Sequence, residues 1–386
     1  MFVILSFIRH SQSMSHILHV VGARPNFMKV APVIDALSRF GSARQTLVHT
    51  GQHYDANMSD IFFEQLDLPR PDISLGIGSG PHGAQTGQIM HRFEEVLLQQ
   101  QPDLVLVYGD VNSTIAAALV CAKLPIKLGH VEAGLRSHDR SMPEEINRIV
   151  TDQLSDILFT PSADGDANLL REGIRAEKMH RVGNVMIDTL KRLLPQARRP
   201  KLPAISGKYA LVTLHRPSNV DDPEIFGRIL RTLAELSKQL QIVFPIHPRT
   251  RNKFAEHPQA VFDPQRVLLL EPLGYLEFLA LEQHATVVVT DSGGVQEETT
   301  WLRVPCLTLR ENSERPITVD VGTNILIGSD MDRLHQEVDR ILSGVTTLSR
   351  IPPLWDGRAA ERIADVIAEL VLDQTSVVRS KPRRAA

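Results

Sequence analysis

Cysteine is scarce in this chain of 386 residues. Cys121 and Cys306 are the only two, and each lies in an apolar segment far from the other. So few cysteines exclude the disulfide framework that stabilises many small secreted domains. Both are expected to be small buried hydrophobic side chains in a protein from a reducing compartment, and we therefore predict a cytoplasmic location.

Long apolar runs are missing as well. No stretch of about 18 apolar residues occurs, which excludes a transmembrane helix. The apolar stretch at 2–8 is short and follows no positively charged segment, so it does not resemble a signal peptide. We predict that Met14 is the true first residue and that the 13 residues before it are wrongly assigned or disordered. Residues 1–15 are therefore placed outside the first predicted domain as an N-terminal extension.

A surplus of positive charge is also absent. The chain has 42 Lys and Arg residues against 45 Asp and Glu residues, and its formal net charge is −3. Proteins that bind nucleic acids normally carry a basic surplus, so we expect no nucleic-acid partner. An anionic small ligand is compatible with this charge, because a few well-placed cations suffice to bind it.

The sequence lacks the motifs of cofactor-dependent and metal enzymes. GIGSG at 76–80 does not join a strand to a helix as a dinucleotide-binding fingerprint does, and no Walker motif occurs. His49 and His53 are four residues apart, but no further metal ligand accompanies them. No Gly-x-Ser-x-Gly elbow of a serine hydrolase is present. The sequence therefore predicts no cofactor and no metal.

What the chain does contain is a regular alternation of β-rich apolar runs and amphipathic helical runs. This alternation predicts parallel sheets with right-handed crossovers. We predict an α/β protein with two Rossmann-like doubly wound domains that face each other across a cleft. The predicted strands are 16–22, 45–50, 102–110, 125–132 and 155–161 in the first domain, and 209–215, 241–247, 266–272, 286–294 and 304–310 in the second.

The domain boundaries follow from a pause in this pattern. A stretch rich in Pro, Lys and Arg at 191–208 is predicted to be the linker between an N-terminal domain at 16–190 and a C-terminal domain at 209–356. Residues 357–386 are predicted to form a helix near 359–372, which packs back on the N-terminal domain, followed by a disordered tail.

The first candidate binding segment is GARPNFMK at 22–29, directly after the first predicted strand. In open parallel sheets, ligands bind beyond the carboxyl ends of the strands. Gly22 permits a tight turn, and Arg24 and Lys29 lie at the start of a helix, where backbone N–H groups already favour an anion. Solvated surface charges are the alternative, but the position at a strand end favours a diphosphate site.

The second segment is DSGGVQEE at 291–298, again at a strand end. Ser292, Gly293 and Gly294 can present consecutive N–H groups to a phosphate with no side chain in the way. Glu298 falls about one turn into the next helix, where it could accept hydrogen bonds from two ribose hydroxyls. The alternative is an acid that stabilises the helix dipole. The neighbouring glycines favour the ribose.

Acidic residues end the two strands between these segments. Asp110 and Glu132 follow consecutive predicted strands, so they should be neighbours at one edge of the sheet, and Glu144 and Glu145 follow in MPEEINR. Carboxylates around one sugar can have their pKa values pushed apart, so that one is a base and another an acid. The alternative is capping or pairing with nearby arginines: Arg136, Arg140 or Arg148.

His215 ends the first strand of the second predicted domain, in TLHRPSN. A single histidine is more often structural than catalytic. Because His215 lies at a strand end beside Arg216, we favour contact with a ligand phosphate. His247, in PIHPRT, is a weaker candidate of the same kind.

Together and in this order, these segments resemble the non-hydrolysing UDP-N-acetylglucosamine 2-epimerases. The resemblance extends from His16 to the final predicted helix and rests on GARPNFMKVAP, HTGQHYD, GD at 109–110, GHVEAGLRS, PEEINR, VGNVMID, DSGGVQEE and ERP at 314–316. It implies the glycosyltransferase-B-like fold of that family, a homodimer, and a role in cell-surface polysaccharide biosynthesis.

The resemblance also implies a reaction in which UDP is eliminated across C1–C2 of the sugar and then re-added after the C2 proton returns from the opposite face. UDP-N-acetylglucosamine would become UDP-N-acetylmannosamine. The implied catalytic residues are Asp110, Glu132, Glu144 and His215. The implied substrate-binding residues are Arg24 and Lys29 for the diphosphate, Ser292, Gly293 and Gly294 for phosphate, Glu298 for ribose, Phe278 for uracil, and Arg148 and Arg315 for the sugar.

Several departures from the family pattern leave the substrate open. RPSN follows His215 where the best-known members have a second Arg and a Glu. Tyr54 stands where allosterically regulated members have Arg, so activation by a second UDP-sugar is not expected. Leu273 and Gly274 replace polar residues near the uracil. A decorated substrate such as UDP-2,3-diacetamido-glucuronate is one alternative. A UDP-sugar-dependent glycosyltransferase is a less favoured one, and a non-catalytic UDP-sugar-binding module is disfavoured by the number of acids.

Overall fold

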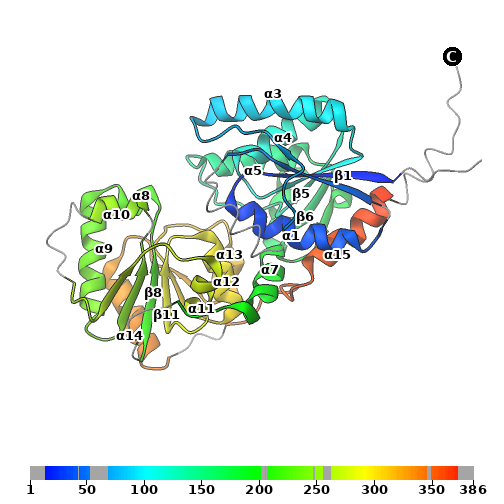
Figure 1. Cartoon of the computed structure of the whole chain (residues 1–386). Coiled ribbons are helices and arrows are strands. Elements are labelled where there is room, and N and C mark those ends of the chain that lie inside the picture. The colour runs from blue at the N-terminus through cyan, green and yellow to red at the C-terminus, as the bar shows by residue number, and fades with distance from the viewer. Residues whose placement is uncertain are drawn as a thin grey trace, which may run out of the picture. The chain divides into compact units, whose positions relative to one another are not determined.

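The computed structural model describes residues 14–372 except 42, 53–67, 201–204, 206, 247, 255–261 and 346–348. These residues form two parallel β-sheets flanked by helices (Figure 1). They divide into two compact units. Unit 1 contains residues 14–131, 149–159 and 360–372, and unit 2 contains 132–148 and 160–359.

The first sheet has the strand order β3-β2-β1-β4-β5-β6-β7. All seven residues of β1 are buried, because a parallel strand is covered by helices on both faces. The strands of the first sheet are β1 (Ser15–Val21), β2 (Ala43–His49), β3 (Ile73–Ser74), β4 (Leu104–Tyr108), β5 (Lys127–Val131), β6 (Ile157–Thr160) and β7 (Met179–Arg181). β1 pairs with β4, and Tyr108 at the end of β4 is the register partner of Val131 at the end of β5.

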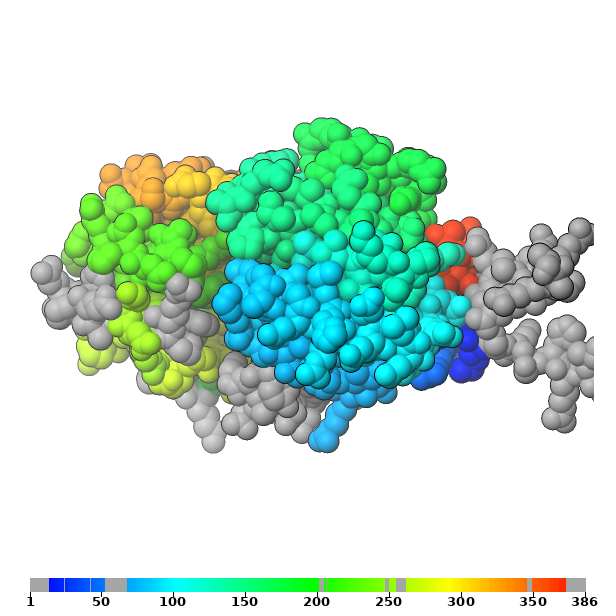
Figure 2. All heavy atoms as spheres, turned by 90° about the horizontal axis from the view of Figure 1, so that it is seen from above, coloured from blue at the N-terminus to red at the C-terminus, as the bar shows by residue number. Residues whose placement is uncertain are grey.

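Amphipathic helices cover this sheet. Helix α3 buries residues three or four positions apart, including Ile89, Phe93 and Val96, and Figure 2 shows its remaining residues on an outer surface of unit 1. Helix α15 lies beside α1 and is joined to it by an ion pair of 3.3 Å between Glu361 and Arg39 (Figure 1). The helices are α1 (Arg24–Ser38), α3 (His82–Gln100), α4 (Asn112–Lys123), α5 (Pro143–Leu154) and α15 (Ala359–Ile367), which continues as η3 (Ala368–Leu372).

The second sheet has the order β10-β9-β8-β11-β12-β13, and alternate residues of β8 contribute to two apolar clusters. Ala210 and Val212 pack in the cluster that includes α9 and α14, whereas Tyr209 and Leu211 pack in the cluster that includes α11 and α12. Helices therefore cover both faces of the sheet. The strands are β8 (Tyr209–Thr213), β9 (Gln241–Pro245), β10 (Val267–Leu270), β11 (Val287–Thr290), β12 (Cys306–Thr308) and β13 (Asn324–Leu326).

The helices of the second sheet follow its strands in turn. They are α8 (Pro217–Val220), α9 (Pro223–Leu236), α10 (Pro248–Phe254), α11 (Tyr275–Glu282), α12 (Gly293–Leu302), α13 (Pro316–Asp320) and α14 (Met331–Leu342). Along the chain, α6 (Ala163–Arg171) and η1 (Ala176–Lys178) precede β7, and α7 (Val185–Leu193) and η2 (Leu194–Gln196) follow it. Helical structure thus continues to Gln196, beyond the predicted start of the linker at residue 191. At the N-terminus, Ser15 already belongs to β1. Of the rest of the predicted extension, the structure describes only residue 14. The domain boundaries remain predictions.

Both sheets have the strand order of a Rossmann fold. Numbered from its first strand, each reads 3-2-1-4-5-6, and the first sheet adds β7 at its edge. The predicted α/β class with two Rossmann-like parallel sheets is confirmed. The order reverses between β1 and β4 and between β8 and β11, which are the points where such sheets bind ligands. Among the described helices, none combines the length and the hydrophobicity needed to cross a lipid bilayer.

Candidate active site

The loop between β1 and α1 lies at the first reversal of strand order. The backbone N–H groups of Gly22 and Ala23 each donate to Asn26 Oδ1 at 3.0 Å, and Asn26 Nδ2 donates to the Tyr108 carbonyl at 2.7 Å. A Cβ atom on Gly22 would lie 2.0 Å from the Ser113 hydroxyl oxygen. Glycine is therefore required here by the close approach of Ser113, and not by a left-handed backbone.

Arg24, Lys29 and Asp110 all lie near this reversal point. Arg24 is the first residue of α1, although its side chain lies outside the described part of the chain, and Lys29 is buried on the same helix. Asp110 is half-buried and follows β4 directly after Gly109. All three therefore belong to unit 1 and follow β1 or β4, where the strand-end prediction put them.

The second reversal point is the start of α12. Ser292 is the N-cap residue, and its N–H donates to Thr290 Oγ1 at 3.0 Å, so this N–H is already used within the protein. Gly293 and Gly294 open the helix, where backbone N–H groups point out of the first turn toward an anion. This part of unit 2 can therefore receive a phosphate mainly through its two glycines.

His215, after β8, is tied to Asp291, after β11. The Nδ1 atom of His215 lies 3.0 Å from Asp291 Oδ1, and the backbone N–H groups of His215 and Arg216 donate to the same carboxylate. Burial alone would raise the pKa of Asp291, but hydrogen bonds from His215, Arg216 and Asn219 hold this pKa below its usual value. The sequence analysis assigned Asp291 no role, although its place at a strand end beside two glycines was a usable signal.

Arg315 gathers three buried glutamates in unit 2. Its guanidinium lies 2.8 Å from Glu297, 2.5 Å from Glu314 and 3.5 Å from Glu132. Arg310 also contacts Glu314, at 2.8 Å. Despite burial, the charges of Arg315 and Arg310 hold the pKa of Glu314 well below its usual range. The structure thus brings together the predicted Glu132 and Arg315, and adds Glu297 and Glu314, which the sequence analysis missed.

Glu132 has an unusual backbone conformation. Its φ of 76° is in the left-handed region, which costs about 1–3 kcal/mol for a residue other than glycine. Such outliers persist where surrounding contacts hold them, and they cluster at functional sites. The ion pair with Arg315 is one of the contacts that hold this side chain. Both the conformation and the position after β5 single out Glu132 among the acids of unit 2.

Glu144 and Glu145 are neighbours with different environments. Glu145 is buried and accepts hydrogen bonds from the N–H and hydroxyl of Ser137 and from the His138 N–H, and it pairs with Arg148 at 2.6 Å. Glu144, in the first turn of α5, is only half-buried. Glu145 is therefore the acid to which the alternative of pairing with an arginine applies. Its partner Arg148 is also the residue that was predicted to contact the sugar.

Glu298 lies beyond the first turn of α12, so the helix-dipole alternative does not explain it. It is buried and accepts a hydrogen bond of 2.8 Å from the Tyr275 hydroxyl. The fully buried Glu282 is its neighbour, and burial together with the charge of Glu298 raises the pKa of Glu282 well above its usual value. Tyr275 and Glu282, both on α11, were not anticipated from the sequence.

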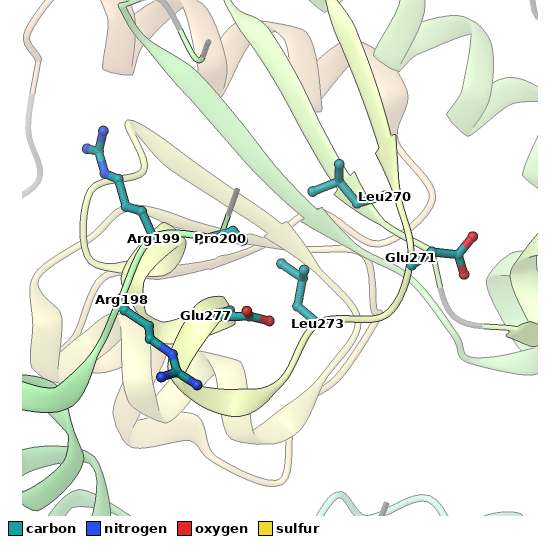
Figure 3. Close-up of a pocket in the computed structure, with 7 residues that line it drawn as sticks. All are labelled: Arg198, Arg199, Pro200, Leu270, Glu271, Leu273 and Glu277. Atoms are coloured by element: carbon teal, nitrogen blue, oxygen red, sulfur yellow. The ribbon is translucent and has the colours of Figure 1, made fainter. Parts of the chain in front are cut away.

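A cavity of about 570 Å³ lies at the loop between β10 and α11 (Figure 3). It is lined by Arg198, Arg199, Pro200, Leu270, Glu271, Leu273 and Glu277. Two arginines and two glutamates balance its charge, so it has no evident preference for a phosphate. Phe278, the predicted uracil contact, does not line it and packs instead at the edge of an apolar cluster with Leu273. His247 and Tyr54 lie outside the described residues.

Two Rossmann-like parallel sheets, with glycines and charged residues at both reversals of strand order, give this chain a glycosyltransferase-B-like α/β fold. The family model for UDP-N-acetylglucosamine 2-epimerase matches residues 35–368. The chain belongs to this epimerase family, as the sequence resemblance predicted.

Two named relatives and one solved structure agree with this membership. The chain is 44% identical over 359 residues to the UDP-N-acetylglucosamine 2-epimerase of Methanococcus maripaludis, which covers 90% of this chain and 97% of that protein. It is 42% identical over 357 residues to the UDP-2,3-diacetamido-2,3-dideoxy-D-glucuronate 2-epimerase of Pseudomonas aeruginosa, covering 92% of this chain and 99% of that protein. The Methanocaldococcus jannaschii UDP-GlcNAc 2-epimerase, solved in complex with UDP-GlcNAc and UDP, matches with a TM-score of 0.84 and 43% identity, covering 92% of this chain and 99% of that one.

Proposed function

We propose that this protein is an isomerase that reversibly epimerises C2 of a UDP-N-acetylhexosamine, converting UDP-N-acetylglucosamine to UDP-N-acetylmannosamine by elimination and re-addition of UDP. The observation that carries the proposal is its likeness, at 43% identity and a TM-score of 0.84, to a 2-epimerase solved with UDP-GlcNAc and UDP. The proposal involves no cofactor and no metal.

Three acids are proposed to carry the proton transfers. Asp110 and Glu132 follow β4 and β5, whose last residues are register partners, and Glu144 lies in the first turn of α5. One carboxylate removes the C2 proton as UDP leaves C1, and another returns a proton to the opposite face of the bound 2-acetamidoglucal. General acid–base groups of this kind contribute about 10²–10⁴-fold each to the rate.

The departing UDP is proposed to be held by cations and by helix N-termini. Arg24, Lys29 and His215 would contact the diphosphate, with the N–H groups of Gly293 and Gly294 as further donors. The tie between His215 Nδ1 and Asp291 supports this role, because it orients the imidazole ring at a strand end. We further propose that Ser292 belongs to the phosphate site, Glu298 binds the ribose, Phe278 lies near the uracil, and Arg148 and Arg315 line the sugar.

Incubation with UDP-N-acetylglucosamine in D₂O tests the proposal. We expect deuterium at C2 and a mixture of the two epimers, because the proton returned to C2 comes from solvent-exchanged acids. Free sugar without an epimerised UDP-sugar would indicate hydrolysis or transfer to an acceptor instead. Unchanged UDP-N-acetylglucosamine that nevertheless binds would indicate either an epimerase of a decorated substrate or a binding module.

A decorated substrate is the second candidate. The 42% identity to the P. aeruginosa UDP-2,3-diacetamido-glucuronate 2-epimerase is close to the 44% identity to the M. maripaludis enzyme, so identity does not separate the two. The ratio of kcat/KM for the two UDP-sugars, measured side by side, decides between them. A ratio above about 10² in either direction corresponds to about 2.7 kcal/mol of discrimination in the transition state.

Location, assembly and pathway are proposed from the same family membership. We propose that the protein is a cytoplasmic homodimer that supplies a building block for cell-surface polysaccharides. Light scattering coupled to size-exclusion chromatography tests the dimer, for which the expected mass is twice the 43.0 kDa of one chain.

A further inference from the structure

His130 connects two elements of unit 1 through a fully buried side chain. It is the second-last residue of β5, and its Nδ1 atom lies 2.6 Å from Oδ1 of Asp152 on α5. Both side chains have no exposed surface. On the opposite side of the ring, Nε2 lies 2.9 Å from the carbonyl oxygen of Gly109. The imidazole therefore spans the distance between Asp152 and the turn that follows β4.

This carbonyl belongs to the peptide bond that joins Gly109 to Asp110. The N–H of Gly109 donates to the Val131 carbonyl at 3.0 Å, so β5 holds Gly109 at its N–H through the backbone and at its C=O through the His130 ring. Gly109 has a φ of 64°, a left-handed conformation that glycine adopts readily. The orientation of this peptide plane determines where the Cα atom of Asp110 lies and how its side chain leaves the backbone.

The hydrogen-bonding groups determine which way the proton points. A carbonyl oxygen can only accept, and a carboxylate also accepts, whereas a neutral imidazole has a single N–H. The contact with the Gly109 carbonyl therefore requires a hydrogen on His130 Nε2, and Asp152 fixes the plane of the ring through its contact with Nδ1.

We propose that His130, oriented by Asp152, is a positioning residue for Asp110: it restrains the Gly109–Asp110 peptide so that the Asp110 carboxylate is held in its reactive geometry. The inference rests on the proposed function, in which Asp110 is a catalytic acid or base. Neither His130 nor Asp152 needs to touch the substrate in this role.

Two substitutions separate the two hydrogen bonds. In His130→Asn the amide nitrogen takes the place of Nδ1, so the bond to Asp152 survives and the bond to Gly109 is lost. In His130→Gln the amide nitrogen takes the place of Nε2, so the bond to Gly109 survives and the bond to Asp152 is lost. We expect kcat to fall by about 10²-fold in H130N and by less than about tenfold in H130Q, with UDP affinity unchanged in both.

The two variants should rank in the opposite order in stability and in kcat. This difference distinguishes a positioning role of His130 from a purely structural one. H130Q removes a hydrogen bond to the buried carboxyl of Asp152, whereas H130N removes one to a neutral carbonyl. Hydrogen bonds to charged groups contribute more to stability, so H130Q should be the less stable of the two variants. A structural role predicts that the less stable variant is also the slower one. Our proposal predicts that the more stable H130N is the slower one, when both are assayed well below their unfolding temperatures.

A double-mutant cycle with Asp110→Asn tests whether His130 acts through Asp110. We expect H130N to leave the slow residual C2 deuterium incorporation of D110N unchanged. His19 offers a matched control, because it is equally buried in β1, on the other side of β4 from β5. Its ring bonds to the Tyr108 hydroxyl at 2.7 Å and to Gln45 at 3.0 Å. His19→Gln should lower stability without a selective loss of kcat.

Hydrogen–deuterium exchange of the peptide around 104–112 gives a readout that does not need catalysis. We expect faster exchange in H130N than in H130Q. Equal exchange in the two variants, equal kcat values, or a full further loss in the D110N/H130N double variant would each overturn the inference. Absence of C2 deuterium in the unmodified protein would instead overturn the proposed function, and the exchange experiment would still decide whether His130 restrains the Asp110 turn.

Discussion

His215 and Asp291 are 76 residues apart in the chain, yet Nδ1 of His215 lies 3.0 Å from Oδ1 of Asp291. The same carboxylate accepts the backbone N–H groups of His215 and Arg216 and the side-chain amide of Asn219. One buried aspartate thus joins the loop after β8 to the end of β11, at the reversal of strand order in the second sheet.

Asp291→Asn should destabilise the protein and weaken UDP binding. The new amide group would place a donor against backbone N–H donors, and each orphaned buried group costs about 1–3 kcal/mol. Urea unfolding at neutral pH measures the loss. Asp222→Asn is the matched control, because Asp222 is an exposed N-cap and asparagine caps a helix equally well. Equal stabilities of the two variants would contradict the prediction.

Glu144→Gln and Glu145→Gln should have different effects although the residues are adjacent. E144Q should lose about 10²–10⁴-fold in rate with little change in stability, because Glu144 is a proposed acid or base. E145Q should lose about 1–3 kcal/mol of stability, because Glu145 accepts hydrogen bonds from Ser137, His138 and Arg148. Epimerisation rates and urea unfolding of both variants check this. An E144Q enzyme with normal turnover would remove Glu144 from the mechanism.

Gly293→Ala and Gly294→Ala should also differ in stability although the two residues are adjacent. A Cβ on Gly293 would lie 2.6 Å from Arg315 Nη1 and 2.7 Å from Glu314 Oε1, whereas none of the described atoms lies within 4 Å of a Cβ on Gly294. Without ligand, G294A should therefore gain up to about 0.5–1 kcal/mol from the better helix propensity of alanine. G293A should be destabilised, because Arg315 and Glu314 are buried and paired. Equal gains in the free energy of unfolding would show that Arg315 moves aside easily.

Glu282 should make stability fall as pH rises. Burial and the charge of Glu298 raise its pKa in the folded protein well above the ordinary 4.5, so between these two values the unfolded chain binds fewer protons. The free energy of unfolding should decrease with increasing pH across this window. Glu282→Gln should flatten that slope, whereas the exposed Glu94→Gln on α3 should leave it unchanged. Unfolding curves collected from pH 5 upward test this, and an unaltered slope in E282Q would contradict it.

Local pattern accounts for the parts of the fold that could be predicted. Strand β4 (Leu104–Tyr108) lies within the predicted strand 102–110, because a short continuous apolar run is typical of a buried parallel strand. The short strands β3, β7 and β13 were missed, since two or three residues carry too little periodicity to recognise. Pro195 suggested an open linker, but it occupies an early position of η2, where proline is tolerated, so helical structure continues to Gln196.

The sequence by itself determined the alternation of strands and helices, the placement of Arg24, Asp110, Glu132 and His215 after strands, and the family. These properties depend on neighbours in the chain, or on motif order, and both can be read from one sequence. Only the tertiary structure decided the partners: Arg315 with Glu132, His215 with Asp291, and Asp152 with His130. Ion pairs and hydrogen bonds form wherever folding brings charged groups together, and residue spacing along the chain does not encode which distant carboxylate a given cation will meet.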